Sequence, residues 1–166
     1  MLLKPTAREN RVTDITPEQL KGMGVSALLL DVDNTLSTHH GTVLLDGLLE
    51  WIQNIRESGI ELLILSNSKK RRVGPVAEGW GLDFVSLGVK PLPFGFIRAL
   101  KALKLKRSKV ALAGDQIFTD VLGARLIGLK VFLLEPIKLE DGISFKIRRY
   151  FEARLKNYYN KKGWFM

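Results

Sequence analysis

Two aspartates one residue apart, Asp31 and Asp33, close a short apolar run and could together perform covalent chemistry on a phosphate ester. In an extended segment, side chains two residues apart point to the same side, so both carboxylates can face one reacting centre. One carboxylate could attack phosphorus while the other transfers protons. A divalent cation would then have to offset the repulsion between the attacking carboxylate and the phosphate.

Three further segments carry side chains that suit the same reaction. Ser66 and Lys90 offer a hydroxyl and an ammonium group for phosphate oxygens, and Asp115 offers a further carboxylate, with Asp120 five residues beyond it. Magnesium prefers oxygen ligands and keeps several waters, so it needs only a carboxylate or two from the protein plus substrate phosphate. Positioning and charge stabilisation would do most of the catalytic work. The sequence therefore indicates a Mg2+ site built from separate segments.

These side chains need a scaffold that brings them together, and the apolar pattern predicts one. Runs of strand length alternate with amphipathic stretches of helical period. The runs lie at residues 27–30, 62–65, 84–87, 110–113 and 131–134. Strands this continuously apolar are typical of a parallel sheet that helices cover on both faces. We therefore expect an α/β fold with a three-layer, doubly wound, Rossmann-like and mostly parallel five-stranded sheet.

Every candidate site residue follows one of the expected strands. Asp31 and Asp33 follow the first strand and Ser66 follows the second, while Lys90 and Asp115 follow the third and fourth. The loops after parallel strands share one edge of the sheet, which is where such folds bind ligands. We therefore expect these side chains to converge.

Helix boundary signals support the alternation of strands and helices. Gly59 and Gly81 each end an amphipathic stretch as a C-cap, and Pro93 can occupy the first turn of a later helix. Thr119 is expected to cap a helix that runs through residues 121–128. Each of these helices has the length needed to connect two neighbouring parallel strands.

The segments resemble the motifs of the haloacid dehalogenase superfamily of phosphatases: DxDxT, a Ser/Thr, a Lys and GDxxxxD. In this chain the motifs are residues 31–35, Ser66, Lys90 and residues 114–120. LLLDVDNTL, LILSNS, VKPLPFGFIRAL and GDQIFTD further resemble the small YqeG-type phosphatases of subclass IIIA. That group is similar to phosphatidylglycerophosphate phosphatases, so the resemblance implies a phosphoric monoester hydrolase.

The resemblance implies a role for each matching aspartate. Asp31 would form a phosphoaspartate, and Asp33 would act as general acid and then as general base toward water. Asp31, Asp115 and the backbone carbonyl of Asp33 would bind Mg2+, and Asp120 would support the metal site. These four residues are the expected metal ligands and their support.

The same resemblance implies how a phosphorylated substrate is held. Ser66 and Asn67 would contact the phosphate, and Lys90 would steady both the nucleophile and the phosphate. Residues 36–62 leave room for one flap and one helix, and residues 68–84 leave room for one helix, so no separate cap domain fits. Capless members act on substrates too large to enclose, such as lipids at a surface, phosphoproteins or nucleic acid ends, and the YqeG-type likeness makes phosphatidylglycerophosphate the first candidate. A phosphoprotein, a nucleotide or another soluble phosphate remains an alternative.

Composition bounds the class of protein. A chain of 166 residues with 46% hydrophobic composition can bury one core, so we expect a single domain over residues 1–166. The absence of cysteine excludes disulfides and thiolate metal sites, but not a site of oxygen ligands. No apolar run reaches the length of a membrane span and no signal-peptide pattern opens the chain, so we expect a cytoplasmic protein without a transmembrane segment.

The formal net charge of +9 is concentrated toward the end of the chain. Residues 138–166 hold eight Lys or Arg against three Asp or Glu, and their apolar side chains recur at helical spacing. The apolar positions are Ile147, Tyr150, Phe151, Leu155 and Tyr158, with Trp164 and Phe165 close to the end. We expect a basic amphipathic extension that either binds an anionic membrane peripherally or packs onto the domain.

Two non-enzymatic interpretations share part of this pattern. A phospho-receiver domain also combines an acidic cluster, magnesium and a lysine, but its phosphorylated aspartate follows the third strand, where this chain has Lys90. It would also lack the acid/base group that Asp33 supplies. A nucleic-acid-binding module would use the basic surface, yet no nucleic-acid motif supports one. His39 and His40 could contact substrate, although exposed flap residues are the simpler interpretation.

Overall fold

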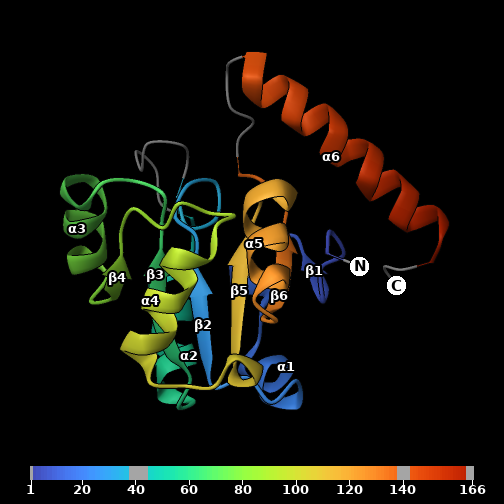
Figure 1. Cartoon of the computed structure of the whole chain (residues 1–166). Helices are drawn as coiled ribbons and strands as arrows, with labels where there is room; N and C mark the ends of the chain where they lie inside the picture. Colours follow the sequence, from blue (N-terminus) through green and yellow to red (C-terminus); the bar gives the residue numbers. More distant parts are fainter. Residues whose placement is uncertain (1, 38–44, 138–142, 164–166) are drawn as a thin grey trace.

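The computed structural model describes residues 2–37, 45–137 and 143–163 (Figure 1). Its six strands form one parallel sheet in the order β1-β6-β5-β2-β3-β4. The strands are β1 (Ala7–Glu9), β2 (Ala27–Leu30), β3 (Glu61–Leu65), β4 (Asp83–Val85), β5 (Val110–Gly114) and β6 (Lys130–Leu134). The expected doubly wound, Rossmann-like sheet is confirmed, with six strands in place of five. His39, His40, Trp164 and Phe165 lie outside the described residues.

The additional strand, β1, carries no apolar run that could have predicted it. Its sequence is Ala-Arg-Glu, all three residues are half-buried, and it pairs with β6 alone. An edge strand of this kind is held by backbone pairing and side-chain contacts at its ends, and Arg8 forms an ion pair with Glu135 just after β6. Strand β4 also ends two residues before the expected residue 87, because Leu87 has a φ of 49°, which cannot continue a strand.

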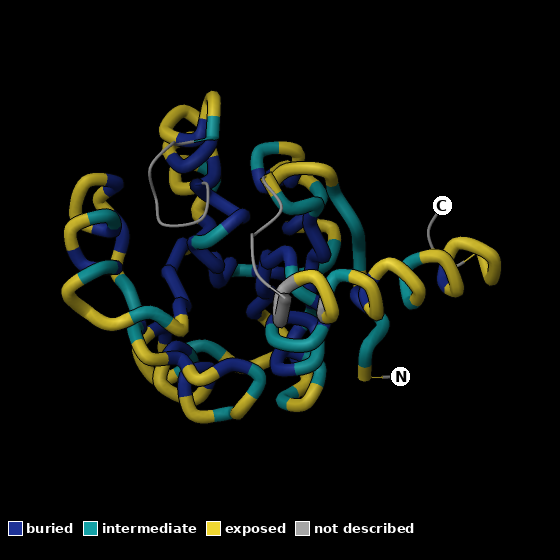
Figure 2. Tube along the Cα trace, turned by 90° about the horizontal axis from the view of Figure 1, so that it is seen from above, coloured by how far each residue is buried: buried dark blue, intermediate teal, exposed yellow. Residues whose placement is uncertain are grey.

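Helices cover both faces of the sheet (Figure 2), and the sheet separates the apolar core into two layers. One face carries α1 (Pro17–Gly22), α2 (Leu48–Glu57) and α3 (Lys70–Gly79), and the other carries α4 (Pro93–Leu103) and α5 (Leu122–Leu126). Short 3-10 turns lie at Val12–Asp14 and Arg107–Lys109. Leu28 and Leu30 pack on the first face and Leu29 on the second, because successive strand residues point to opposite faces. Burial on both faces explains the continuously apolar strands.

Most helix boundaries lie where the sequence predicts them. Helix α4 begins at Pro93, and Gly59 and Gly81 take positive φ values of 85° and 63° after α2 and α3. The prediction for Thr119 was wrong. Residues Ile117–Val121 form a π-helical turn, η4, ahead of α5, and the Thr119 hydroxyl donates to the Gln116 side chain. The backbone N–H of Gln116 instead donates to the Asp120 carboxylate at 3.1 Å, which lets the turn begin earlier.

The last helix, α6 (Ile143–Lys161), packs on the domain through charged side chains together with Leu155 and Tyr159. Its buried or half-buried positions are Arg149, Glu152, Leu155, Lys156 and Tyr159. Four of the apolar positions on its other side are exposed, namely Ile147, Tyr150, Phe151 and Tyr158. The helix therefore packs on the domain, but by the side opposite to most of its apolar stripe. In the described ranges, no helix is both long and apolar enough to cross a membrane.

Gly95 in the first turn of α4 determines how closely this helix approaches the loop that carries Lys90. A Cβ on Gly95 would lie 2.4 Å from the Gly88 carbonyl oxygen, and this backbone cannot move aside cheaply. We expect Gly95→Ala to lower the free energy of unfolding in urea by about 1–3 kcal/mol through overpacking. Gly79→Ala is the control, because a Cβ there meets nothing within 4 Å. Equal stability of the two variants would contradict the close approach.

Candidate active site

The strand order determines where polar side chains gather. The chain runs from β2 to its neighbour β3 on one side, and it later returns to β5 on the other side of β2. Such a reversal opens a crevice at the carboxyl ends of the strands. Leu30 of β2 is in register with Ala113 of β5, so Asp31 lies beside the segment that carries Asp115. The candidate site is at this reversal.

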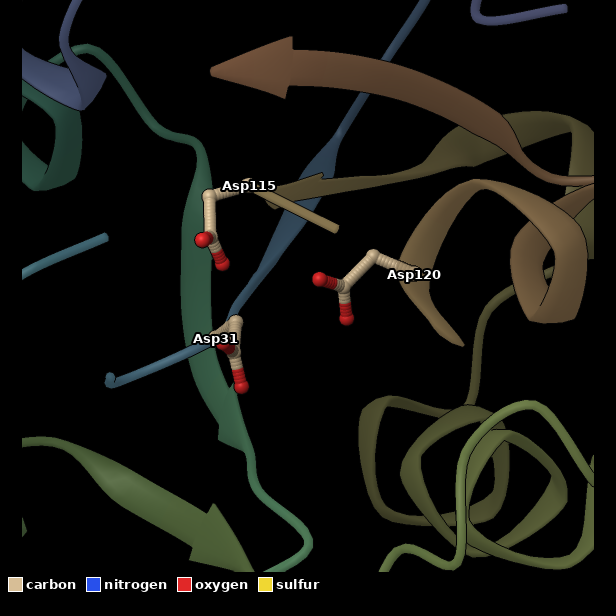
Figure 3. Close-up of side chains that lie close together, drawn as sticks. All are labelled: Asp31, Asp115 and Asp120. Carbon is tan, nitrogen blue, oxygen red and sulfur yellow. The ribbon is translucent and has the colours of Figure 1, made fainter. Parts of the chain in front are cut away.

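Three carboxylates meet at these strand ends (Figure 3). Asp31, Asp115 and Asp120 each place one carboxylate oxygen within 4.8 Å of the others, and all three residues are buried. Asp120 reaches the group from turn η4 because Gly114 has no side chain. A Cβ on Gly114 would lie 2.5 Å from Cγ of Asp120. The glycine before Asp115 is therefore a steric requirement of the cluster.

Lys90 joins two of these carboxylates. Its Nζ lies 2.6 Å from Oδ1 of Asp31 and 2.6 Å from Oδ1 of Asp120, and only 3% of its side chain is exposed. Burial works to lower the pKa of Lys90, but the two carboxylates outweigh burial and raise it. The ammonium group is therefore charged throughout the physiological pH range.

Ser66 and Asn67 shape the loops on either side of Lys90. The Asn67 amide accepts from the backbone N–H of Lys90 at 2.7 Å and donates to its carbonyl at 3.2 Å. The Ser66 hydroxyl accepts from the backbone N–H of Ser68 at 3.1 Å. The Asn67 bonds join the end of β3 to the loop after β4, whereas the Ser66 bond is local to the loop after β3.

The Asp33 carboxylate has a different neighbour. It forms an ion pair with Arg72 of α3, which also donates to the Ser68 hydroxyl at 2.7 Å. The Asp33 side chain is 19% exposed, whereas that of Asp31 is 10% exposed. The Asp33 carboxylate is therefore more accessible to water than that of Asp31.

Burial dominates the electrostatics of the cluster. Desolvation raises the pKa of Asp31 to about 7, although the Lys90 ammonium group acts in the opposite direction. Desolvation also raises the pKa of Asp115 well above its usual range, with Arg149 opposing it. Carboxylates in such surroundings gain stability when a cation neutralises them.

The donor set fits a hard divalent cation such as Mg2+. Asp115 Oδ1 is buried and has no hydrogen-bond partner within the described part of the chain, although a buried polar atom normally has one. Three carboxylates in reach of one another supply the oxygen ligands that Mg2+ prefers. Asp31 and Asp115 would hold such an ion, and Asp120 would lie beside it.

The structure brings most of the expected site residues together and adds three. Asp31, Lys90, Asp115 and Asp120 form one contact network, with Asn67 attached to its lysine. Arg72, Arg149 and Glu152 were not among the residues predicted from the sequence. Arg72 belongs to a basic run after the second predicted strand, which was a usable signal. Arg149 and Glu152 follow Asp115 by more than 30 residues, and no motif links them to it.

The haloacid dehalogenase-like hydrolase family matches residues 9–128, and this chain belongs to that family. A protein of Bacillus subtilis named probable phosphatase YqeG is 35% identical over 149 residues, which cover 90% of this chain and 87% of that protein. The resemblance seen in the motifs is therefore confirmed.

Solved structures share the fold at low sequence identity. An uncharacterised protein from Listeria monocytogenes matches with a TM-score of 0.58 and 18% identity, over 72% of this chain and 86% of that chain. The cobalt-bound deoxy-D-mannose-octulosonate 8-phosphate phosphatase of Haemophilus influenzae matches with a TM-score of 0.54 and 13% identity, over 76% and 75%. These similarities support the arrangement of strands and helices described above.

The raised pKa of Asp31 predicts a pH-dependent cost to stability. A carboxyl group whose pKa is higher in the folded than in the unfolded chain destabilises the fold progressively as pH rises between the two values. In EDTA, we therefore expect Asp31→Asn to gain about 2 kcal/mol over wild type in free energy of unfolding between about pH 5 and pH 8. Urea unfolding at both pH values measures it. A pH-independent difference would contradict the shift.

Proposed function

We propose that this protein is a Mg2+-dependent phosphatase that hydrolyses phosphomonoesters through an aspartyl-phosphate on Asp31. The observation that carries the proposal is the contact of the Asp31 carboxylate with the Lys90 ammonium group, beside the Asp115 and Asp120 carboxylates. Family membership and the similarity to a probable phosphatase support hydrolysis of a phosphate ester. The bound cation would supply charge neutralisation for the phosphate and the carboxylates.

In the first step, an Asp31 carboxylate oxygen forms a bond to phosphorus. The bond from phosphorus to the substrate's ester oxygen breaks, and its electron pair leaves on that oxygen, which takes a proton from Asp33. Lys90 holds the Asp31 oxygen and offsets the negative charge that gathers at the phosphoryl group. Ser66 lies at the neighbouring strand end, and we assign its hydroxyl to the phosphate.

In the second step, water attacks the phosphorus of the aspartyl-phosphate. Asp33, now a carboxylate, accepts the water proton while the bond from phosphorus to Asp31 breaks and inorganic phosphate forms. The ion pair with Arg72 orients Asp33 for both transfers. Asn67 positions Lys90 through its backbone, and its contact with phosphate stays a prediction.

Two isosteric substitutions test this mechanism. With an aryl phosphate and Mg2+, we expect Asp31→Asn to lower kcat by at least about a thousand-fold, because an amide is no nucleophile here. Asp33→Asn should lower kcat by about a hundred-fold or more through loss of proton transfer. Steady-state phosphate release, with Mg2+ or EDTA, measures both.

Asp83→Asn is the control, because this exposed aspartate begins β4 at the other end of the strands. It should leave kcat within about twofold, as expected for a surface site. Undiminished turnover by Asp31→Asn would reject the mechanism. Salt-sensitive binding of nucleic acid without Mg2+-dependent turnover would instead support a nucleic-acid-binding function.

We further propose that the substrate is a phosphorylated lipid, with phosphatidylglycerophosphate as the first candidate. Exposed apolar side chains flank the catalytic lysine in the loop and the first turn of α4. They are Leu87, Val89, Leu92 and Phe94, of which Phe94 is 62% exposed. Helix α6, which also contacts the site, exposes a second apolar set together with basic side chains such as Arg154. Apolar side chains with basic neighbours suit the surface of an anionic bilayer.

The short connections around the site leave it accessible to a bulky substrate such as a phosphorylated lipid. Only residues 31–47 separate β2 from α2, and residues 66–69 separate β3 from α3, so neither connection can hold a cap domain. A bilayer could therefore present a headgroup phosphate to Asp31. On this proposal the protein works in the cytoplasm and binds the membrane peripherally.

Vesicle binding tests the lipid surface separately from catalysis. We expect Phe94→Ser and Phe151→Ser each to weaken retention on vesicles of phosphatidylglycerol and phosphatidylcholine by about tenfold, because each removes an aromatic ring from the apolar surface. Aryl phosphate turnover should stay unchanged. Leu126→Ser is the control, because Leu126 is 51% exposed at the far end of α5. Equal retention of all variants would contradict the proposed surface.

Substrate preference distinguishes lipid from soluble substrates. We expect kcat/KM for phosphatidylglycerophosphate in mixed micelles to exceed that for a nucleotide, a phosphopeptide and a short-chain phosphate ester by more than about tenfold, because the apolar surfaces add binding energy. Faster hydrolysis of one of the soluble compounds would assign the substrate to that class.

A further inference from the structure

Helix α6 reaches into the carboxylate cluster with one side chain, Arg149. One of its terminal nitrogens, Nη2, forms an ion pair with Oδ2 of Asp115. The other, Nη1, donates to the backbone carbonyl of Asp115 at 3.1 Å and to Oε2 of Glu152 at 3.0 Å. The guanidinium group thus holds both the carboxylate and the backbone of Asp115, each through a different nitrogen of its planar fork.

Glu152 extends this contact to the turn that carries Asp120. Its side chain is 2% exposed, and its second oxygen, Oε1, accepts from the backbone N–H of Ile117 at 2.7 Å. Ile117 begins η4, so a residue of α6 satisfies the first N–H group of this turn. Arg149 and Glu152 therefore brace Asp115 directly and Asp120 through its turn.

The charges of this group leave a deficit that a divalent cation would fill. Four buried carboxylates, those of Asp31, Asp115, Asp120 and Glu152, meet two cationic side chains, Lys90 and Arg149. Four negative and two positive groups leave two negative charges when all are ionised. Arg149 is therefore compatible with a bound cation.

We propose that Arg149 is a positioning residue of the cation site, and that α6 is a working part of that site. Arg149 holds Oδ2 of Asp115, which leaves Oδ1, buried and unpartnered within the described residues, available to the cation. Hydrogen bonds to a ligating carboxylate commonly control its orientation and the affinity for the metal. The family match ends at residue 128, so this contribution comes from outside the matched segment. The inference rests on the cation site of the proposed function, and not on the substrate.

Calorimetric titration with Mg2+ tests the role of Arg149 directly. We expect Arg149→Met to weaken Mg2+ binding by about tenfold or more. Lys156→Met is the matched control, because Lys156 lies on the same helix, has the same side-chain exposure of 15%, and pairs with Glu135 instead. It should bind Mg2+ as wild type does. Mg2+ affinity of Arg149→Met equal to or tighter than that of the control would overturn the proposal.

A kinetic readout separates positioning from simple loss of structure. For Arg149→Met, the Mg2+ concentration that gives half-maximal turnover should rise about tenfold, while KM for an aryl phosphate at saturating Mg2+ stays constant. Arg149→Lys keeps the positive charge but loses the planar fork of donors, so it should give an intermediate Mg2+ requirement. This variant replaces Arg149→Met in the test if the methionine variant does not fold. A change in KM with an unchanged Mg2+ requirement would overturn the proposal.

Wild type is the reference that separates the two proposals. Wild-type protein that binds no Mg2+ would overturn both the proposed function and the role of Arg149. If wild type binds Mg2+ and Arg149→Met binds it equally well, only the proposed role of Arg149 would be overturned.

Discussion

Desolvated negative charge at the ends of β2 and β5 is the constraint on which the rest of the structure depends. Asp31, Asp115 and Asp120 are buried within 4.8 Å of one another, where burial disfavours their charged forms. The fold offsets this cost with cations from two distant segments, the buried Lys90 and the half-buried Arg149. The buried carboxylates that lower the stability of the fold are thus the same groups that would bind the cation.

The loop that delivers Lys90 shows what this arrangement demands of the backbone. Leu87 and Val89 adopt positive φ values of 49° and 53°, a conformation that is rare for a β-branched residue such as Val89. Such backbone persists only where the surroundings hold it. Here the Asn67 amide binds the backbone of Lys90, and the N–H of Gly95 donates to the Gly88 carbonyl at 3.2 Å. Local strain is therefore concentrated beside the proposed nucleophile.

The sequence predicts the parts of the molecule that follow from local pattern. Strands such as β5 and β6 were predictable because both faces are buried and their runs are apolar, and the convergence of Asp31, Lys90 and Asp115 follows from parallel strand ends. Strand β1 was not predictable, since backbone pairing at an edge leaves no apolar signal. Arg149 was equally hidden, because the side of α6 that meets the domain is not its predicted apolar stripe, and Arg149 contacts Asp115 across 34 residues of chain.

The central claim is that Asp31 carries the phosphoryl group during turnover. The most direct measurement is peptide mass spectrometry of acid-quenched Asp33→Asn after reaction with an aryl phosphate and Mg2+. This leaving group needs little protonation, so the first step should proceed while loss of the general base slows hydrolysis of the intermediate. We expect one phosphoryl group on the peptide that contains Asp31, and none when Asp31→Asn is added. Phosphate release without any phosphoryl group on that peptide would contradict the claim.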